Sequence, residues 1–286
     1  MKHILLCLFL FAVSYAHAQV NPDSIKYRIE TVDGNNYVGT IVMQDASTIT
    51  FRSETLGVIV LQKSNVRRMD MVSGTQSKDG TYWFENPQAS RYFWQSNGYG
   101  VKAGEGYYQN VWILFNHVTY GITDNFQIGA GVVPLFLFAG SSTPVWLNPK
   151  FSIPVAKDRF NLGIGALVGT VIGAESPVFG LLHGTGTLGT RDRNISLGIG
   201  YGYADGELTE VPAISLSGMW RTGEKGYLLT ENYYIHAGDE TVLLLFFGGR
   251  RMLGRASLDF GAMFPTNAGE AIFIPWLGIG IPFGRS

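Results

Sequence analysis

The feature that most constrains this chain is a two-residue alternation that runs through long stretches of its C-terminal two-thirds. From Phe160 to Ile172 the even positions are mostly large and apolar, whereas the odd positions begin with Asn161 and Gly163. The same pattern recurs from Ile195 to Tyr203 and from Arg255 to Phe264. Side chains of a β-strand point alternately to its two faces. The alternation therefore predicts long strands that have one apolar face.

The second face of these stretches carries glycine and serine where a soluble protein would carry charge. Glycine supplies 37 of 286 residues, and only 15% of the residues are charged, against about 25% in typical soluble domains. A small, uncharged face suits the crowded lining of a closed barrel better than it suits water. Aromatic residues fall near the expected strand ends, where membrane barrels have interfacial girdles: Tyr108, Tyr120, Phe160, Tyr201, Tyr203, Phe264 and Phe283. The pattern favours a transmembrane antiparallel β-barrel over a soluble β-fold with a ligand pocket.

Residues 1–18 have the order of a secretory signal peptide. Lys2 precedes an apolar run from Ile4 to Val13, and Ala16-His17-Ala18 fits a signal-peptidase site. The single cysteine, Cys7, lies inside this run, so the expected mature chain has no disulfide and no thiolate metal ligand. After the signal peptide the longest apolar stretch, Val242 to Phe247, is far shorter than the ~18 residues of a membrane helix. An exported chain of this kind can still cross a membrane as a closed barrel.

A more polar region, residues 19–75, precedes the barrel. Turn sequences such as Asp33-Gly34-Asn35-Asn36 divide it into short segments. Five strands are expected: Ile25–Thr31, Tyr37–Met43, Thr48–Ser53, Val58–Gln62 and Val66–Met71. Such a set resembles a small SH3-like or Sm-like barrel at the level of pattern. Residues 76–89 are then expected to be a linker, and residues 90–286 the membrane barrel.

Turn residues divide the barrel region into twelve expected strands, of which the first runs from about Arg91 to Val101. Connections on one side fall at 123–125, 157–159, 191–193, 222–226 and 253–254. Those on the other side fall at 102–106, 140–143, 173–177, 205–210, 238–240 and 265–271. An even count places both ends of the barrel on one side, as in single-chain bacterial barrels. The first set of turns and the N-terminal domain are therefore expected in the periplasm.

The barrel region resembles the small outer-membrane β-barrel proteins of Gram-negative bacteria. The residues that carry the likeness are Tyr120-Gly121-Ile122-Thr123-Asp124-Asn125-Phe126, a tight turn between two strands, and the last strand, Ile272 to Phe283. In that family a terminal aromatic residue is the signal for the barrel-assembly machinery, whereas here Gly284, Arg285 and Ser286 follow Phe283. The resemblance implies a bacterial outer-membrane location, with membrane lipid around the barrel and the assembly machinery as a partner.

Four charged residues fall within expected strands, namely Lys150, Glu231, Arg250 and Asp259. A charge that faces lipid at the membrane midplane costs about 2–4 kcal/mol, so all four are expected to face the lumen. Glu231, Arg250 and Asp259 fall at a similar level on three consecutive strands and could form an acid–base–acid cluster. Both a structural ion-pair network and a substrate site fit such a cluster. An inward-facing Glu231 also places Asn232 outward, unless a bulge intervenes.

No catalytic, cofactor or metal motif is found. Outer-membrane phospholipases use a His-x-Ser pair, whereas Thr119 and Thr185 stand two residues after His117 and His183. Together with His236, these histidines lack the spacing of a metal site. The Gly-x-Gly repeats are not followed by a helix that could hold a phosphate. The near balance of 21 basic and 22 acidic residues gives no field for nucleic acid.

These features predict an outer-membrane barrel whose lumen, lined by glycine and serine with few large side chains, passes or binds a small solute. A second hypothesis is a membrane anchor that presents the N-terminal domain to a periplasmic partner. A third is a barrel enzyme that acts on lipid, although the sequence shows no catalytic constellation for it.

Overall fold

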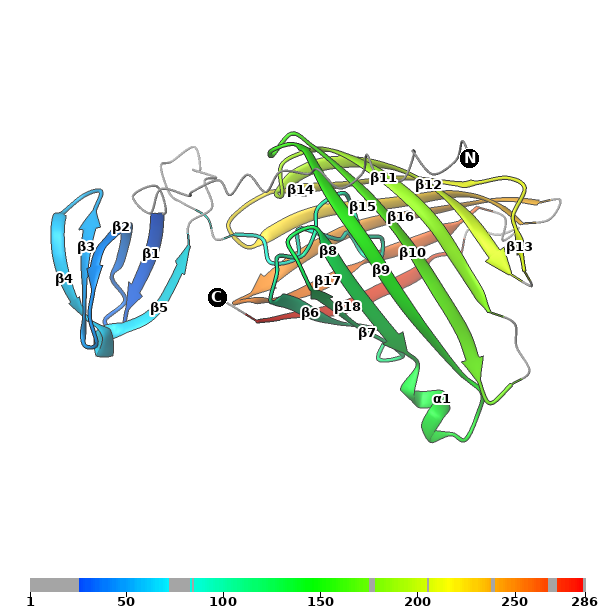
Figure 1. Ribbon diagram of the computed structural model, residues 1–286, viewed down its shortest axis with the longest axis horizontal. Coiled ribbons are helices and arrows are strands. Elements are labelled where there is room, and N and C mark those ends of the chain that lie inside the picture. The colour runs from blue at the N-terminus through cyan, green and yellow to red at the C-terminus, as the bar shows by residue number, and fades with distance from the viewer. Residues whose placement is uncertain are drawn as a thin grey trace, which may run out of the picture. The chain divides into compact units, whose positions relative to one another are not determined.

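The computed structural model describes residues 26–71, 83, 85–174, 178–204, 206–237, 240–266 and 272–284. The expected signal peptide, residues 1–18, and most of the expected linker lie outside this part of the chain. The chain divides into two compact units, Met1–Glu85 and Asn86–Ser286, and each is described by itself (Figure 1).

The first unit contains a five-stranded antiparallel sheet in the order β4-β3-β2-β1-β5. Its strands are β1 (Lys26–Thr31), β2 (Asn36–Gln44), β3 (Thr48–Ser53), β4 (Gly57–Gln62) and β5 (Val66–Met71), and a 3-10 turn at Lys63–Asn65 precedes β5. The core consists of Ile29, Ile49 and Phe51. At the β2–β3 turn the Asp45 carboxylate accepts the Thr48 hydroxyl and the N–H groups of Thr48 and Ser47, and these bonds, the hydroxyl first, hold the pKa of Asp45 well below its usual value. The prediction of five short strands is confirmed.

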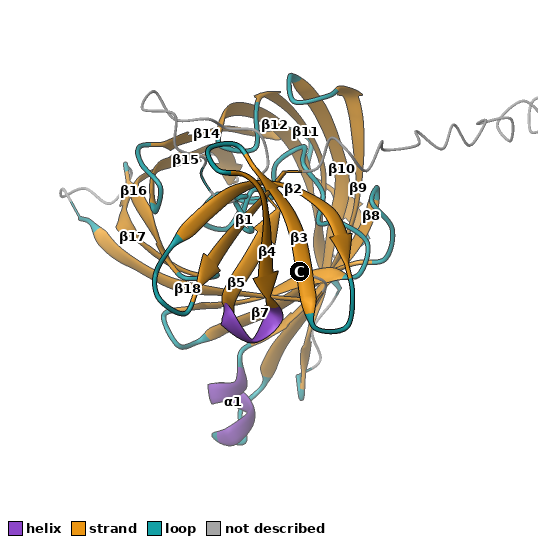
Figure 2. Cartoon of the chain, turned by 90° about the vertical axis from the view of Figure 1, so that its left-hand side faces the viewer, coloured by secondary structure: helices purple, strands orange, loops and turns teal. Residues whose placement is uncertain are grey.

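The second unit is a closed antiparallel barrel. Its wall strands are β6 (Glu105–Val111), β7 (Phe115–Gly121), β8 (Phe126–Val132), β9 (Thr143–Ala156), β10 (Phe160–Ile172), β11 (Phe179–Gly189), β12 (Arg193–Ala204), β14 (Ala213–Arg221), β15 (Gly226–Ala237), β16 (Glu240–Leu253), β17 (Ala256–Pro265) and β18 (Ile274–Gly284). The two-residue β13 (Glu207–Leu208) pairs with the end of β12, and the short helix α1 (Pro134–Phe138) lies between β8 and β9. Pairing of β18 with β6 and of β11 with β12 closes the ring visible in Figure 2. The predicted all-β fold with a barrel of twelve strands is confirmed.

The alternation of the sequence corresponds to the two faces of the wall. On β12, Ile195, Leu197 and Ile199 are 51, 62 and 50% exposed on the outer face, whereas Ser196 on the inner face is 1% exposed. Ile164 and Val168 on β10 are likewise exposed. The apolar face therefore points outward, as lipid requires, and the face of small residues lines the lumen.

The expected position of the first strand is wrong, although the count of twelve is right. Residues 91–101 form no wall strand and instead lie inside the barrel. The stretch that was expected to be one strand after residue 106 is a hairpin, β6 and β7, joined by Trp112, Ile113 and Leu114. Trp112 and Ile113 have φ angles of 52° and 67°, a region that glycine or asparagine usually marks in a sequence. One missing strand and one additional strand leave the total unchanged.

Both ends of the barrel chain lie at one end of the wall, which we term the terminal end. β6 begins there and β18 ends there, and the turns 122–125, 157–159, 190–192, 222–225 and 254–255 lie at the same end. The connections at the opposite, far end include the longer ones, 133–142, 205–212 and 266–273. No helix among the described residues has the length and apolar character to cross a membrane.

Three neighbouring strands make the wall low on one side. β6, β7 and β8 have seven residues each, whereas β14 has nine and β9 has fourteen. β6 ends opposite Gly278, so residues 274–277 of β18 extend beyond it toward the far end. On the other side, β8 ends opposite Val145, so residues 143–144 of β9 extend beyond it toward the far end, and residues 152–156 of β9 extend beyond its start toward the terminal end. We term this low part of the wall the notch.

Candidate functional site

Residues 86–104, termed the inserted segment, enter the lumen from the terminal end and return to it. Near the start of the segment, Asn86 Nδ2 donates a hydrogen bond to the carbonyl of Arg191 at 3.2 Å. At its end the Gly104 N–H donates to the carbonyl of Gly121 at 2.9 Å. Both acceptors lie at or next to terminal-end turns. Residues 92–95 between these anchors form the tip of the segment, and Arg91 bridges to Ser96 at the base of the tip.

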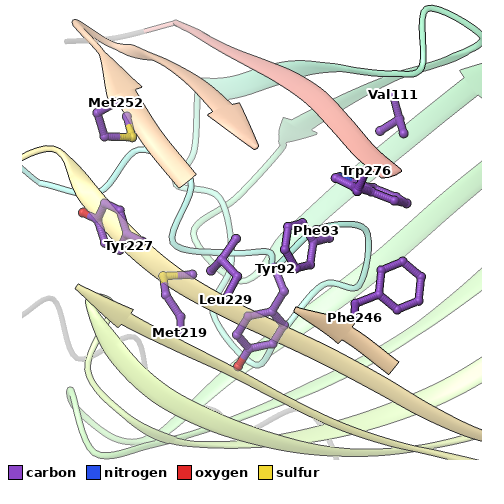
Figure 3. Close-up of a cluster of buried hydrophobic side chains, with 9 residues drawn as sticks. All are labelled: Tyr92, Phe93, Val111, Met219, Tyr227, Leu229, Phe246, Met252 and Trp276. Carbon is purple, nitrogen blue, oxygen red and sulfur yellow. The ribbon is translucent and has the colours of Figure 1, made fainter. Parts of the chain in front are cut away.

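The inserted segment corrects the expectation of a lumen with few large side chains. Arg91, Tyr92 and Phe93 are each 0% exposed. In Figure 3, Tyr92 and Phe93 lie among side chains of the wall that include Phe246 and Trp276. Side chains of the inserted segment therefore occupy the lumen next to the terminal end.

Glu231 binds the tip of the inserted segment. Its Oε2 accepts three consecutive backbone N–H groups, from Phe93 at 2.8 Å, Trp94 at 2.9 Å and Gln95 at 3.1 Å. Its Oε1 accepts the Tyr233 hydroxyl at 2.6 Å. Glu231 is 0% exposed, so these four bonds replace the hydration that a buried carboxylate loses.

Asp259 joins the wall to the inserted segment through two arginines. Its carboxylate binds Arg250 on the neighbouring strand, with Nε–Oδ1 at 2.6 Å and Nη2–Oδ2 at 3.1 Å. It also binds Arg91 of the segment, with Nη1–Oδ2 at 2.6 Å. Arg250 Nη1 and Nη2 donate in addition to the carbonyls of Gln88 and Tyr92. All three charged groups are almost fully buried.

Lys150 binds the returning half of the segment, because its Nζ donates to the carbonyl of Tyr99 at 2.7 Å. All four lumen charges singled out in the sequence therefore face inward, and each is at most 1% exposed. Arg250 and Asp259 are direct cross-strand partners. Glu231 and Lys150 are separate from that pair and bind other parts of the segment. All four residues therefore bind the inserted segment, but they do not form one cluster.

Asn232 faces outward, as the position of Glu231 requires. The pairing of β14, β15 and β16 is continuous around it, without a bulge. Its Nδ2 donates to the carbonyl of Leu216 at 3.0 Å and to Thr230 Oγ1 at 2.9 Å. The outward amide group is therefore hydrogen-bonded within the wall.

Small polar residues of the wall bind the rest of the segment. Gln95 exchanges hydrogen bonds with Ser215 and Ser217, and the Gly98 N–H donates to Thr187 Oγ1 at 2.7 Å. A Cβ on Gly98 would lie 2.4 Å from the carbonyl oxygen of Asn161. The segment can therefore approach the wall this closely only with glycine at position 98.

Toward the far end the inner face of the wall becomes apolar. The side chains there occupy inward-facing positions, at two-residue spacing along the strands. They are Leu167, Val171, Phe179, Leu181, Tyr233, Ile235, Val242, Leu244, Met263 and Ile274. Each is only partly buried, which shows that open space remains between them. We term this space the apolar chamber.

A small polar cavity lies between the tip of the segment and strands β6 to β9. It is narrow, because the centre of a water-sized molecule can occupy only about 20 Å³ of it. Its lining is uncharged apart from one imidazole and consists of Trp94, Ser96, Tyr107, Gln109, His117, Thr119, Gln127, Trp146 and Asn148. Polar side chains from the wall and an indole from the tip of the segment therefore face one another across this cavity.

His117 is fixed by its neighbours in a form that does not activate Thr119. Trp146 Nε1 donates to His117 Nδ1 at 3.1 Å, and His117 Nε2 lies 3.0 Å from Thr119 Oγ1. Because Nδ1 accepts a hydrogen bond, the proton of a neutral ring resides on Nε2. A general base requires a free nitrogen facing the hydroxyl. His183 and His236 lie on β11 and β15, which are not neighbours of β7 or of each other.

No protein-family model and no curated sequence matches the chain. Among solved structures, the KdgM porin in complex with disordered oligogalacturonate is 7% identical, with 64% of this chain and 99% of that chain covered and a TM-score of 0.46. A doubly substituted porin of Rh. blastica is 11% identical, with coverages of 91% and 99% and a TM-score of 0.33. OmpT of Vibrio cholerae, expressed in the outer membrane, is 15% identical, with coverages of 91% and 95% and a TM-score of 0.31. The barrel assignment rests on the strand pairing itself.

Proposed function

We propose that this protein is an outer-membrane β-barrel that binds a small solute in its lumen and is closed at its terminal end by the inserted segment. The observation that carries the proposal is that Lys150, Glu231, Arg250 and Asp259 all bind this segment. Because all four of these buried charged residues bind the same internal segment, they hold that segment in the lumen. Passage through the lumen then requires the segment to leave.

The outer surface supports the membrane location. Large apolar side chains are exposed around the whole wall, for example Leu147, Leu197, Phe247 and Ile279. Such a continuous apolar surface would be unstable in water and is stable in lipid. The short turns at the terminal end match the periplasmic side of bacterial barrels, and the longer connections match the outer side. This orientation supports a periplasmic location for the N-terminal unit.

Conductance across planar lipid bilayers tests the closure. We expect the full chain to show no steady conductance. A chain that begins at residue 102, and therefore lacks the segment through Val101, should give discrete conductance steps. Assembly of each protein is checked by its heat-dependent migration in gels, which folded membrane barrels show. Steady conductance of the full chain, or silence of both folded proteins, would contradict the proposed closure.

The first unit supports a second candidate function, that of a membrane anchor for a partner-binding domain. Its strand order and the 3-10 turn before β5 support a likeness to SH3-like and Sm-like barrels. Within the described sheet β4 is an edge strand, and its Val58 and Val60 are 59 and 62% exposed. An exposed strand edge is a surface that can pair with an added strand. Deletion of residues 20–75 should abolish binding of a periplasmic partner while the barrel still assembles.

A further inference from the structure

The notch is too low for its three strands to cross a membrane. A transmembrane β-strand needs about 9–11 residues, whereas β6, β7 and β8 have seven each. At about 3.3 Å per residue they reach roughly 23 Å along the strand, and less along the barrel axis because strands are tilted. At the far end β18 extends four residues beyond β6 and β9 two residues beyond β8, so the wall is lowest at these three strands and hydrocarbon there borders the mouth of the lumen.

The rim of the notch is apolar. Ile113, at the tip of the β6–β7 hairpin, is 87% exposed, and Phe138 at the end of α1 is 85% exposed. Figure 1 shows α1 beyond the far ends of β8 and β9. Ile113 also has a positive φ, which is costly for a β-branched residue. A strained turn that presents isoleucine rather than glycine is consistent with a rim that contacts hydrocarbon.

The apolar chamber lies inside the lumen next to this rim and is closed on the side of the terminal end. Its inward side chains carry no charge among the described residues that define it. Trp276 and Phe246 lie beneath it and pack on Phe93 of the inserted segment, with ring centroids 5.8 and 6.2 Å from the Phe93 ring. A molecule in the chamber therefore meets apolar walls, a floor of aromatic rings and, beside Trp94, the polar cavity.

We propose that the apolar chamber binds the hydrocarbon chain of a single-chain amphiphile with an uncharged polar end, and that this molecule is admitted from the membrane through the notch. The inference rests on the proposed function, because the inserted segment forms the floor. The chain would lie against residues such as Leu167, Leu181 and Leu244. The hydroxyl or amide end would lie in the polar cavity, where Gln109, Gln127 and Asn148 line the wall. A charged end would find no opposite charge in that cavity.

Quenching of tryptophan fluorescence by 11-bromo-1-undecanol tests the binding, because bromine quenches an indole that it touches. The protein is measured in lipid vesicles with Trp83→Phe and Trp220→Phe, which remove an indole outside the barrel unit and one exposed on the outer face. We expect saturable quenching that excess 1-undecanol reverses. Quenching that rises only in proportion to the probe in the membrane would overturn the proposal.

Two matched double variants locate the bound chain. Leu181→Thr/Leu244→Thr changes the chamber, and Leu182→Thr/Leu245→Thr makes the same change on the outer face of the same strands. The chamber variant should weaken binding about tenfold, since each substitution removes apolar contact with the chain. The outer variant should leave affinity within about twofold. Equal effects of the two variants would overturn the assignment to the chamber.

A second matched pair tests the route. Ile113→Asp places a charge at the rim of the notch, whereas Ile122→Asp places one on an exposed turn at the terminal end. Quenching should develop at least about tenfold more slowly in Ile113→Asp, because a charge is costly where hydrocarbon passes. In Ile122→Asp it should develop at the rate of the parent protein. Equal rates would refute lateral admission. A nonconducting full chain that fails to bind the probe would refute this inference and leave the proposed closure intact.

Discussion

Removal of the Glu231 charge should release the inserted segment from the wall. The carboxylate accepts three backbone N–H groups from residues 93–95 at 2.8, 2.9 and 3.1 Å. A hydrogen bond to a charged group contributes about 1.5–3 kcal/mol, against about 0.5–1.5 kcal/mol for a neutral one. Glu231→Gln keeps an acceptor oxygen for these donors but loses the charge. It should therefore weaken docking of the segment by about 3 kcal/mol, roughly 1 kcal/mol for each bond.

Glu231→Ala removes the acceptor altogether. Three buried N–H groups are then left without a partner, and each costs about 1–3 kcal/mol, so docking should weaken by about 6 kcal/mol. Because about 1.4 kcal/mol corresponds to a factor of ten, even the glutamine variant should raise the ratio of open to closed barrels roughly hundredfold. The alanine variant should raise it further.

Single-channel recording in planar bilayers measures this ratio directly as open probability. Glu207→Gln is the matched control, because it removes one carboxylate charge from an exposed residue of β13 at the far end. It should behave as the parent does. An unchanged open probability in a folded Glu231→Ala barrel would refute the conclusion that Glu231 holds the segment in the lumen.

Three further predictions test other parts of the structure. Gly98→Ala should raise open probability, because the added Cβ meets the Asn161 carbonyl at 2.4 Å, whereas Gly184→Ala, with nothing within 4 Å, should not; equal effects in bilayer recordings would contradict the close approach of the segment. Leu197→Lys should lower the free energy of unfolding in lipid vesicles by about 2–4 kcal/mol, as urea titration measures, because it places a charge against hydrocarbon. Asp45→Ala should lower the unfolding temperature of the first unit at neutral pH. Since folding depresses the pKa of Asp45, the difference in unfolding temperature between parent and variant should persist above the usual aspartate pKa and shrink as the pH falls below it. Scanning calorimetry of the full chain measures this difference.

The regular parts of the fold were predictable because they obey local rules. In β10 and β12 the two-residue alternation identifies both the strand and the face that meets lipid. In the first unit, turn residues such as Asp45 separate strands that the structure places within a residue or so of their expected bounds. Charge placement was equally predictable, since the cost of a charge in lipid fixed the direction of Glu231 and Arg250.

The inserted segment was missed because its polar groups are satisfied by distant residues. It contains signals that argue against a wall strand: Tyr92, Phe93 and Trp94 are consecutive aromatic residues without alternation, and Asn97-Gly98 is a turn sequence. The β6–β7 turn gave no signal at all, because Trp112 and Ile113 are residues that strands favour. Their positive φ angles are imposed by tertiary contacts, such as the hydrogen bond from Trp112 Nε1 to the carbonyl of Pro275 at 2.7 Å.

The inserted segment also explains why charges and small polar residues occur together on the inner face. A chain without regular structure brings many unpaired backbone groups into a lumen from which it excludes water, and each of them needs a partner. Glu231 supplies an acceptor for three N–H groups, Arg250 and Lys150 supply donors for carbonyls, and Thr187 accepts one N–H group. Beyond the tip of the segment no such groups need partners, and the inner face becomes apolar from Tyr233 to Ile235 and from Phe246 to Val242. The polarity of the lumen thus follows the depth of the segment, and the apolar remainder is the part of the lumen left open for a ligand.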